Sequence, residues 1–214
     1  MGSFYGNVLV ARECAEVVPL LAGATGVGGE ALRGYALPAG PAHTVIFQPG
    51  PESDAIELAG PLSRLLGAAT LSSYVHDSDV LDLRVFVDGE VRHRFDSWPG
   101  YFDEGEIDED GNPIGGSPTE GHEPMGADPE AFLPLAAGPV DQVVLGAVLR
   151  GRPLDPDDAE DGRYVFADAQ HHDVMEALGL DAHRLSTGYA YLARGYLPEG
   201  LLTDELVVFG GVRG

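Results

Sequence analysis

Hydrophobic and polar residues alternate most clearly between residues 69 and 96, where the pattern predicts three antiparallel strands. In the middle segment, leucine or valine occupies every odd position from 81 to 87, while Asp82 and Arg84 fall on the opposite, partly solvated face. Asp88 and Gly89 supply the two residues with φ above zero that a tight hairpin needs. Strands are therefore predicted at 69–75, 80–87 and 90–96.

A helical period replaces this alternation over residues 54–66, where apolar residues recur along one stripe despite Gly60 and Pro61. The apolar run at 14–21 is a second candidate, although Pro19 must kink or terminate it. Less regular patterns predict helices that begin at 128, lie within 140–149 and extend over 171–178.

The remaining segments are shorter or richer in turn residues. Glycine is frequent over 23–34, and residues 98–129 form a long acidic loop rich in glycine and proline. Short strands are predicted at 3–11, 44–48 and 164–166, and an apolar segment follows at 189–192. This order of elements predicts a single α+β domain over residues 1–214, with a mostly antiparallel sheet covered by helices.

The charge of the chain narrows the class of partner. The sequence has 35 aspartates and glutamates against 12 arginines, with no lysine and a formal net charge of -23 at pH 7. No positive residue occurs between Arg94 and Arg150. A field of this sign repels phosphate backbones and anionic headgroups, so nucleic acid and membranes are not expected. A basic protein is the favoured partner, and the alternative is that the acids serve solubility alone.

Several classes of chemistry are excluded by the lack of lysine. A Schiff base, a Walker phosphate loop and the Tyr/Lys pair of short-chain dehydrogenases all need this residue. The run from Gly23 to Gly29 resembles the phosphate-binding turn of such dehydrogenases, but Gly34 and Pro38 break the helix that must follow. Cys14 lies in an apolar run and is typical of a core residue. No catalytic residue and no cofactor are therefore predicted.

The expected location is the cytoplasm. The chain has a single cysteine, and its first residues contain no charged and apolar regions typical of a signal peptide. No stretch approaches the roughly 18 apolar residues of a membrane span.

Three aromatic residues lie where the third predicted strand passes into the acidic loop, and aromatic residues flanked by charge are typical of binding hot spots. The alternative is that these rings fold back and cap the sheet. The predicted partner-binding residues are Trp98, Tyr101, Phe102, Asp103, Glu104, Asp108 and Asp110.

Two short runs combine histidine with aspartate, which are ligands of zinc and related ions. The candidate metal ligands are His76, Asp77 and Asp79 between two strands, and His171 and His172 near a helix start. Each run has a structural alternative, which is an aspartate-rich turn for the first and a polar helical turn for the second. Residues 106–111 also mimic the start of a calcium loop, but its twelfth position is Ser117. Only weak divalent cation binding is expected there.

Several motifs resemble an uncharacterised family of bacterial, largely actinobacterial, hypothetical proteins. They are Tyr-Val-His-Asp-Ser-Asp-Val-Leu at 74–81, Asp-Gly-Glu at 88–90, the segment 95–103, Gly-Tyr-Ala-Tyr-Leu at 188–192 and Leu-Pro-Glu-Gly at 197–200. The resemblance spans most of the chain. It implies a bacterial cytoplasmic protein and brings no activity, cofactor or site residue with it.

Three functions stay open on these observations. The leading hypothesis is a non-enzymatic acidic interaction module that holds a basic protein, in the manner of immunity or antitoxin proteins. The second is a metal-dependent enzyme built on the histidines and aspartates named above. The third is a small-ligand sensor with a cavity beneath the three predicted strands.

Overall fold

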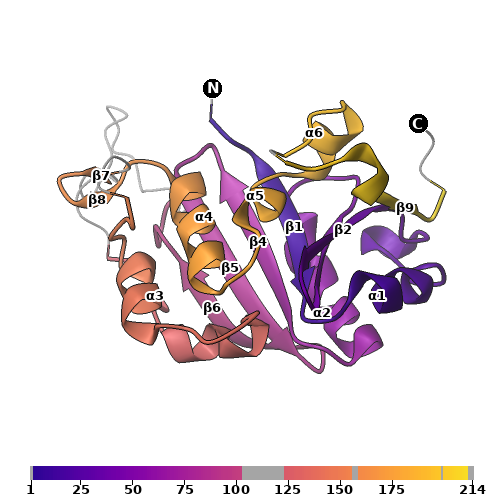
Figure 1. Ribbon diagram of the computed structural model, residues 1–214, viewed down its shortest axis with the longest axis horizontal. Coiled ribbons are helices and arrows are strands. Elements are labelled where there is room, and N and C mark those ends of the chain that lie inside the picture. Colours follow the sequence, from indigo (N-terminus) through magenta and orange to yellow (C-terminus); the bar gives the residue numbers. More distant parts are fainter. Residues whose placement is uncertain (1, 103–122, 156–158, 199, 212–214) are drawn as a thin grey trace, which may run out of the picture.

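The computed structural model describes residues 2–102, 123–155, 159–198 and 200–211, and an antiparallel sheet lies at its centre (Figure 1). Within these residues the strands of the sheet are β1 (Tyr5–Val10), β2 (Gly34–Gly40), β3 (His43–Phe47), β4 (Thr70–His76), β5 (Val80–Val87), β6 (Glu90–Asp96) and β9 (Val207–Phe209). Their order across the sheet is β6-β5-β4-β1-β3-β2-β9. The predicted α+β fold with a mostly antiparallel sheet is confirmed.

Helices lie on both sides of this sheet (Figure 1). The α-helices are α1 (Cys14–Leu21), α2 (Asp54–Leu66), α3 (Gln142–Leu149), α4 (Ala167–Ala177), α5 (Ala182–Leu185) and α6 (Tyr189–Ala193). Short 3-10 helices are η1 (Val27–Gly29), η2 (Pro129–Leu135) and η4 (Thr203–Glu205). A separate two-stranded hairpin pairs β7 (Ala159–Glu160) with β8 (Arg163–Tyr164).

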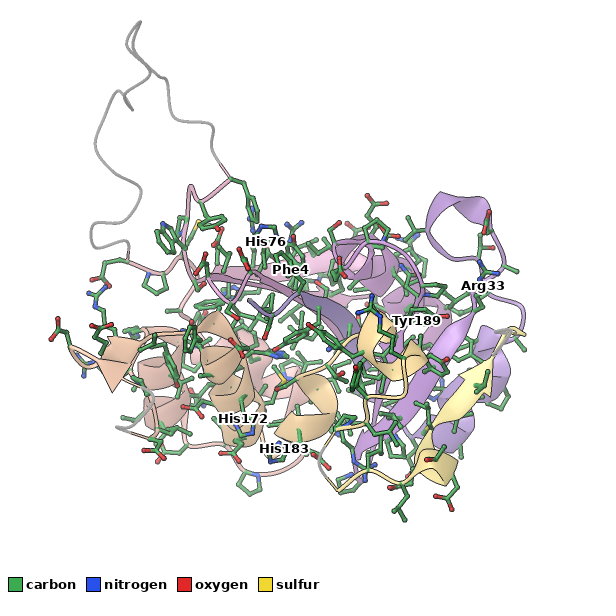
Figure 2. All side chains as sticks on the ribbon, turned by 90° about the horizontal axis from the view of Figure 1, so that it is seen from above. Phe4, Arg33, His76, His172, His183 and Tyr189 are labelled. Atoms are coloured by element: carbon green, nitrogen blue, oxygen red, sulfur yellow. The ribbon has the colours of Figure 1, made fainter. Side chains whose placement is uncertain are left out.

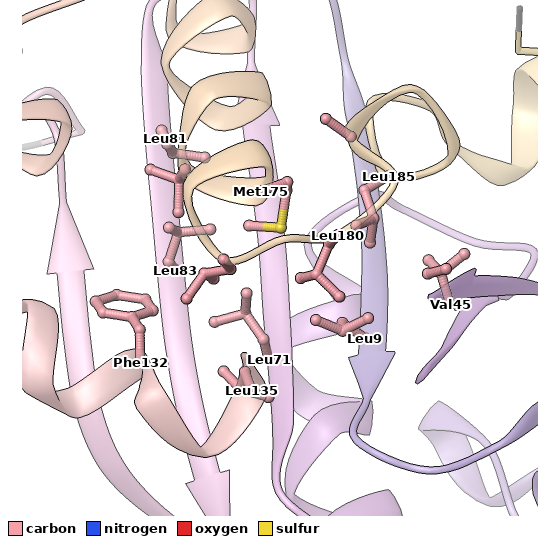
Figure 3. Packing of buried hydrophobic residues seen from close by; sticks show 14 of the residues in the cluster. Leu9, Val45, Leu71, Leu81, Leu83, Phe132, Leu135, Met175, Leu180 and Leu185 are labelled. Atoms are coloured by element: carbon pink, nitrogen blue, oxygen red, sulfur yellow. The ribbon is translucent and has the colours of Figure 1, made fainter. Parts of the chain in front are cut away.

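Alternation along the strands directs apolar side chains into two hydrophobic clusters, one on each face of the sheet. On β1, Tyr5 and Leu9 join the cluster that includes residues of α3, α4 and α5, whereas Val8 and Val10 join the cluster with α1 and α2. The first cluster is the larger. In Figure 3, Leu71 and Leu83 of the sheet lie opposite Met175 of α4, and all three are fully buried.

The second face of the sheet is covered less completely than the first. Here α2 packs on β1, β4 and part of β5, while α1 packs on β2, β3 and β9. Val91, Arg92 and Arg94 of β6 are exposed, and Arg84 of β5 is half-buried. The predicted partly solvated face of the three-strand meander β4–β6 is therefore confirmed at Arg84, Arg92 and Arg94, whereas Asp82 on the same face is buried.

Strand β2 was not predicted from the sequence, in which Gly34 and Pro38 indicate only that no helix forms in this segment. Pro38, which has no N–H to donate, is tolerated in this strand because β9 pairs only with residues 34–36, so Pro38 lies beyond the doubly paired part of β2. The pairing with β3 also shifts register between Pro38 and Gly40, which is a bulge at this point. Arg184 and Asp181 bond to the carbonyls of residues 38 and 39 in place of a further strand.

Other boundaries differ by smaller amounts. The segment from residue 128 forms the 3-10 helix η2, and the N–H of Glu130 in its first turn donates to the side chain of Asp128. Helix α4 begins at Ala167, earlier than the predicted start at 171, and the apolar segment 189–192 lies within helix α6. Among the described residues, no helix combines the length and the apolar character that crossing a membrane requires.

Candidate functional site

The turn between β4 and β5 joins segments that are distant in the sequence. Asp77 and Ser78 adopt left-handed backbone conformations, with φ of 51° and 60°. The N–H of Ser78 donates to the carbonyl of Ser3 at 3.0 Å, and the Ser78 hydroxyl accepts from the N–H of Ser3 at 2.7 Å. The carbonyl of Ser78 accepts from the N–H of Ala167 at 2.7 Å. The turn is thereby tied both to the N-terminal segment and to the start of α4.

This anchoring places Phe4 against His76, at the centre of a group of rings (Figure 2). The ring centroid of His76 lies 5.0 Å from that of Phe4 and 5.1 Å from that of Phe102. Tyr101 is 5.9 Å away, and all three rings meet His76 edge-on, a favoured geometry for aromatic pairs. A 2.8 Å hydrogen bond joins the Tyr74 hydroxyl to His76 Nδ1.

Trp98 and Tyr101 extend this group into the segment after β6. The Tyr101 centroid lies 5.3 Å from the Trp98 ring. The N–H of Trp98 donates to Asp96 Oδ1 at 3.0 Å, and the Tyr101 hydroxyl donates to Asp79 Oδ2 at 3.0 Å. We call the following six residues the aromatic surface: Phe4, Tyr74, His76, Trp98, Tyr101 and Phe102.

The aromatic surface is accessible and lies in a negative environment. The exposed fractions of Phe102 and Phe4 are 58% and 37%, and the neighbouring carboxylates of Asp77 and Asp79 are exposed. Desolvation raises the pKa of Tyr101, and the hydrogen bond to Asp79 and its negative charge raise that pKa further. The part of this shift that comes from the negative charge of Asp79 also favours a bound cation. The predicted acids Asp103, Glu104, Asp108 and Asp110, and the calcium-like run 106–111, lie outside the described residues.

Four charged residues of β5 and β6 continue this face of the sheet. The register sets Asp82 opposite Asp96 and Arg84 opposite Arg94. Opposite charges still pair, because Arg84 Nε lies 2.9 Å from Asp82 Oδ1 and Arg94 Nη2 lies 3.0 Å from Asp82 Oδ2. Burial raises the pKa of Asp96, against the lowering effects of the Trp98 N–H and the arginines. Both arginines are thus neutralised locally, and they do not offset the acids of the turn.

A cavity of about 400 Å³ is lined in part by Trp98. Its lining includes Asp79, Arg150 and Gln170. It sits between the end of the meander and the start of α4, at the edge of the sheet. The interior beneath the meander is instead filled by the larger hydrophobic cluster.

His171, one of the predicted metal ligands, is a core residue. Its Nδ1 is 2.8 Å from the Tyr5 hydroxyl and its Nε2 is 2.9 Å from Ser73 Oγ, so both ring nitrogens have protein partners. Complete burial lowers its pKa to about 3, with a smaller contribution from His172. The imidazole is therefore neutral at physiological pH and positions β1 and β4 against α4.

His172 points elsewhere and belongs to a different cluster. Its Nδ1 lies 3.8 Å from Oδ1 of the buried Asp173, and single ligand atoms of His172, Asp173 and Glu176 all lie within 4.8 Å of one another. His183 packs edge-on against His172, with centroids 4.9 Å apart (Figure 2). The structure thus places the predicted ligands in three environments: His76, Asp77 and Asp79 at the aromatic surface, His171 in the core, and His172 beside two carboxylates.

Phe4 and Tyr74 were absent from the predicted site residues. Tyr74 carried a usable signal, because it lies two positions before His76 on one strand and so shares its face. Phe4 had no local signal, since its position depends on the hydrogen bonds between Ser3 and Ser78, across 75 residues of sequence.

Comparison of the chain with protein-family models, with curated protein sequences and with solved structures found no match. The function must therefore be inferred from the geometry and charge of these sites.

Proposed function

We propose that this protein is a non-enzymatic interaction module that holds a basic protein partner on the aromatic surface, in the manner of immunity or antitoxin proteins. The observation that supports this function is a convergence of two predicted sites. Tyr101 and Phe102 pack against His76, beside the exposed carboxylates of Asp77 and Asp79.

The chemistry of this surface suits arginine and lysine side chains. The face of an aromatic ring attracts a guanidinium or ammonium group, with about 0.5–2 kcal/mol per contact depending on desolvation. Neighbouring carboxylates add charge-assisted hydrogen bonds to the same cation. The formal net charge of -23 raises the encounter rate with a basic protein at low ionic strength.

The surface is also held in place before a partner arrives. Hydrogen bonds from Tyr101 to Asp79 and between Tyr74 and His76 fix two of the rings, and the Ser3–Ser78 bonds fix the segment that carries Phe4. Binding therefore orders few additional side chains, which lowers the entropic cost of association.

The first experiment is capture of partners from an extract of the native host at low salt, followed by a salt step and mass spectrometry. We expect a basic protein in stoichiometric amount that leaves the column as the salt concentration rises. Retention of acidic or neutral proteins alone, or retention that salt does not affect, would contradict the proposal.

Variants then place the contact on the aromatic surface. Phe102→Ala should weaken the affinity for the purified partner by about tenfold or more, as for a hot-spot aromatic. The matched control is Tyr196→Ala, since Tyr196 is 65% exposed but lies outside the aromatic surface. Calorimetric titration of each variant with the partner measures these affinities. Equal affinities of wild type and Phe102→Ala would move the binding site elsewhere.

A further inference from the structure

We propose that His172, Asp173 and Glu176 bind one divalent first-row transition-metal ion of the zinc class. The site lies on α4, on the opposite side of the sheet from Phe4 and His76 (Figure 2). It does not depend on the partner-binding function proposed above.

The spacing of the ligand atoms fits an ion between them. His172 Nδ1 and Asp173 Oδ1 are 3.8 Å apart, which is too long for a hydrogen bond. Two nitrogen or oxygen ligands of a tetrahedral zinc ion lie roughly 3.4 Å apart, given bond lengths of about 2.1 Å. Glu176 follows His172 by four residues on the helix, so both side chains lie on one stripe. One ligand atom of each of the three residues lies within 4.8 Å of the others, so small side-chain rotations are enough to bring these atoms into a common coordination sphere.

Asp173 is held as metal-bound carboxylates usually are. Its side chain is 8% exposed, and its Oδ2 accepts hydrogen bonds from the N–H of Leu154, at 2.8 Å, and from the Tyr164 hydroxyl. These two donors fix the carboxylate and direct Oδ1 toward His172. Partners of this kind orient a metal ligand and strengthen metal affinity.

The chain provides three ligands and leaves room for more. Three protein ligands are typical of zinc sites that keep an open coordination position. His172 and His183 both line an open cavity of about 710 Å³, which also contains Asp168 and the hydroxyl-bearing residues Ser186 and Tyr191. A water molecule or a small ligand can therefore reach an ion bound at His172.

The ligand set also favours a transition metal over the hard cations that an acidic surface attracts. Imidazole nitrogen is a good ligand for zinc, cobalt and nickel, whereas calcium and magnesium prefer oxygen alone. Glu176 lies in the last turn of α4, where the helix dipole stabilises positive charge.

The test uses the full chain without an affinity tag, treated with chelator and then titrated with Zn²⁺ in the presence of excess Ca²⁺. We expect one equivalent of Zn²⁺ to bind, and Co²⁺ to give the absorption spectrum of a nitrogen- and oxygen-ligated ion at the same stoichiometry. His172→Asn and Glu176→Gln should each weaken Zn²⁺ binding by at least about tenfold. The matched control Glu57→Gln removes the same charge from the exposed side of α2 and should bind like wild type.

A graded variant tests the role given to the supporting hydrogen bond. Tyr164→Phe removes one donor to Asp173 and should weaken Zn²⁺ affinity by about 10–100-fold while one equivalent still binds. Thermal unfolding without metal shows whether each variant folds. Failure of folded wild-type protein to bind an equivalent of Zn²⁺ in excess Ca²⁺ would overturn the proposal. So would affinities for His172→Asn and Glu176→Gln equal to that of Glu57→Gln.

Discussion

The two faces of the sheet differ in how far their polar and aromatic side chains are buried. On the face under α3, α4 and α5, His171 is enclosed, and its neighbours Tyr5 and Ser73 satisfy both of its ring nitrogens. On the other face, α1 and α2 leave the end of the meander uncovered, and Phe102 is more than half exposed. The difference indicates that the first group stabilises the fold, whereas the aromatic surface is available to a partner.

The largest difference in stability is expected between substitutions of Phe95, on the covered face, and Phe102, on the aromatic surface. Phe95 is fully buried in the larger cluster, so Phe95→Ala should lower the free energy of unfolding by about 3–5 kcal/mol. Urea unfolding at constant pH measures this loss. A change below about 1 kcal/mol would mean that the covered face is not the main source of stability.

The buried His171 predicts a dependence of stability on pH. Because its pKa is about 3 in the folded protein and about 6.5 in an unfolded chain, the unfolded state binds more protons between these pH values. The free energy of unfolding therefore falls as pH decreases through this window, by about 2 kcal/mol from His171 between pH 7 and pH 5. His171→Gln cannot titrate and should lose this component. Equal pH dependence in wild type and variant would contradict the buried, neutral imidazole.

Arg84, which lies on the same face of the sheet as the aromatic surface, should have an intermediate effect on the free energy of unfolding. Arg84→Met removes two hydrogen bonds to the buried carboxylate of Asp82 and leaves the ion pair of this carboxylate with Arg94. We expect a loss of about 1–2 kcal/mol in the free energy of unfolding. High salt should reduce the difference between wild type and variant, since Arg84 is partly exposed. If salt leaves this difference in the free energy of unfolding unchanged, the loss comes from packing of the arginine stem and not from its charge.

The smallest effect on stability is expected at the aromatic surface. Phe102→Ala should change the free energy of unfolding by no more than about 0.5 kcal/mol, because the ring is largely exposed. The same variant should have the largest effect on partner affinity. Substantial destabilisation by Phe102→Ala would instead support the alternative that these rings cap the sheet.

Local patterns in the sequence predicted the meander and α2 well. Alternation of apolar residues fixed the strands, and Asp88 and Gly89 adopt the predicted positive φ values of 55° and 82°. The pairing of β2 with β9 was not predictable in this way, because it joins segments about 170 residues apart and depends on no turn motif.

The separation of His171 from His172 shows the same limit for the candidate sites. His171 lies on a stripe with Val174, Met175 and Leu178, all buried, so the helical period indicated its inward direction. The partners that close around it, Tyr5 and Ser73, come from strands far away in the sequence. The adjacent histidines therefore predicted a polar site at both positions. Only the packing of α4 on the sheet shows that His171 belongs to the core.

The proposed function requires that the aromatic surface binds a basic partner. The decisive measurement is the dissociation constant of the partner captured from the native host, obtained by calorimetric titration over a range of salt concentrations for wild type, Phe102→Ala and Tyr196→Ala. We expect affinity that falls steeply as the salt concentration rises, weaker binding by Phe102→Ala, and unchanged binding by Tyr196→Ala. Binding that is insensitive to salt and equal in all three proteins would contradict it.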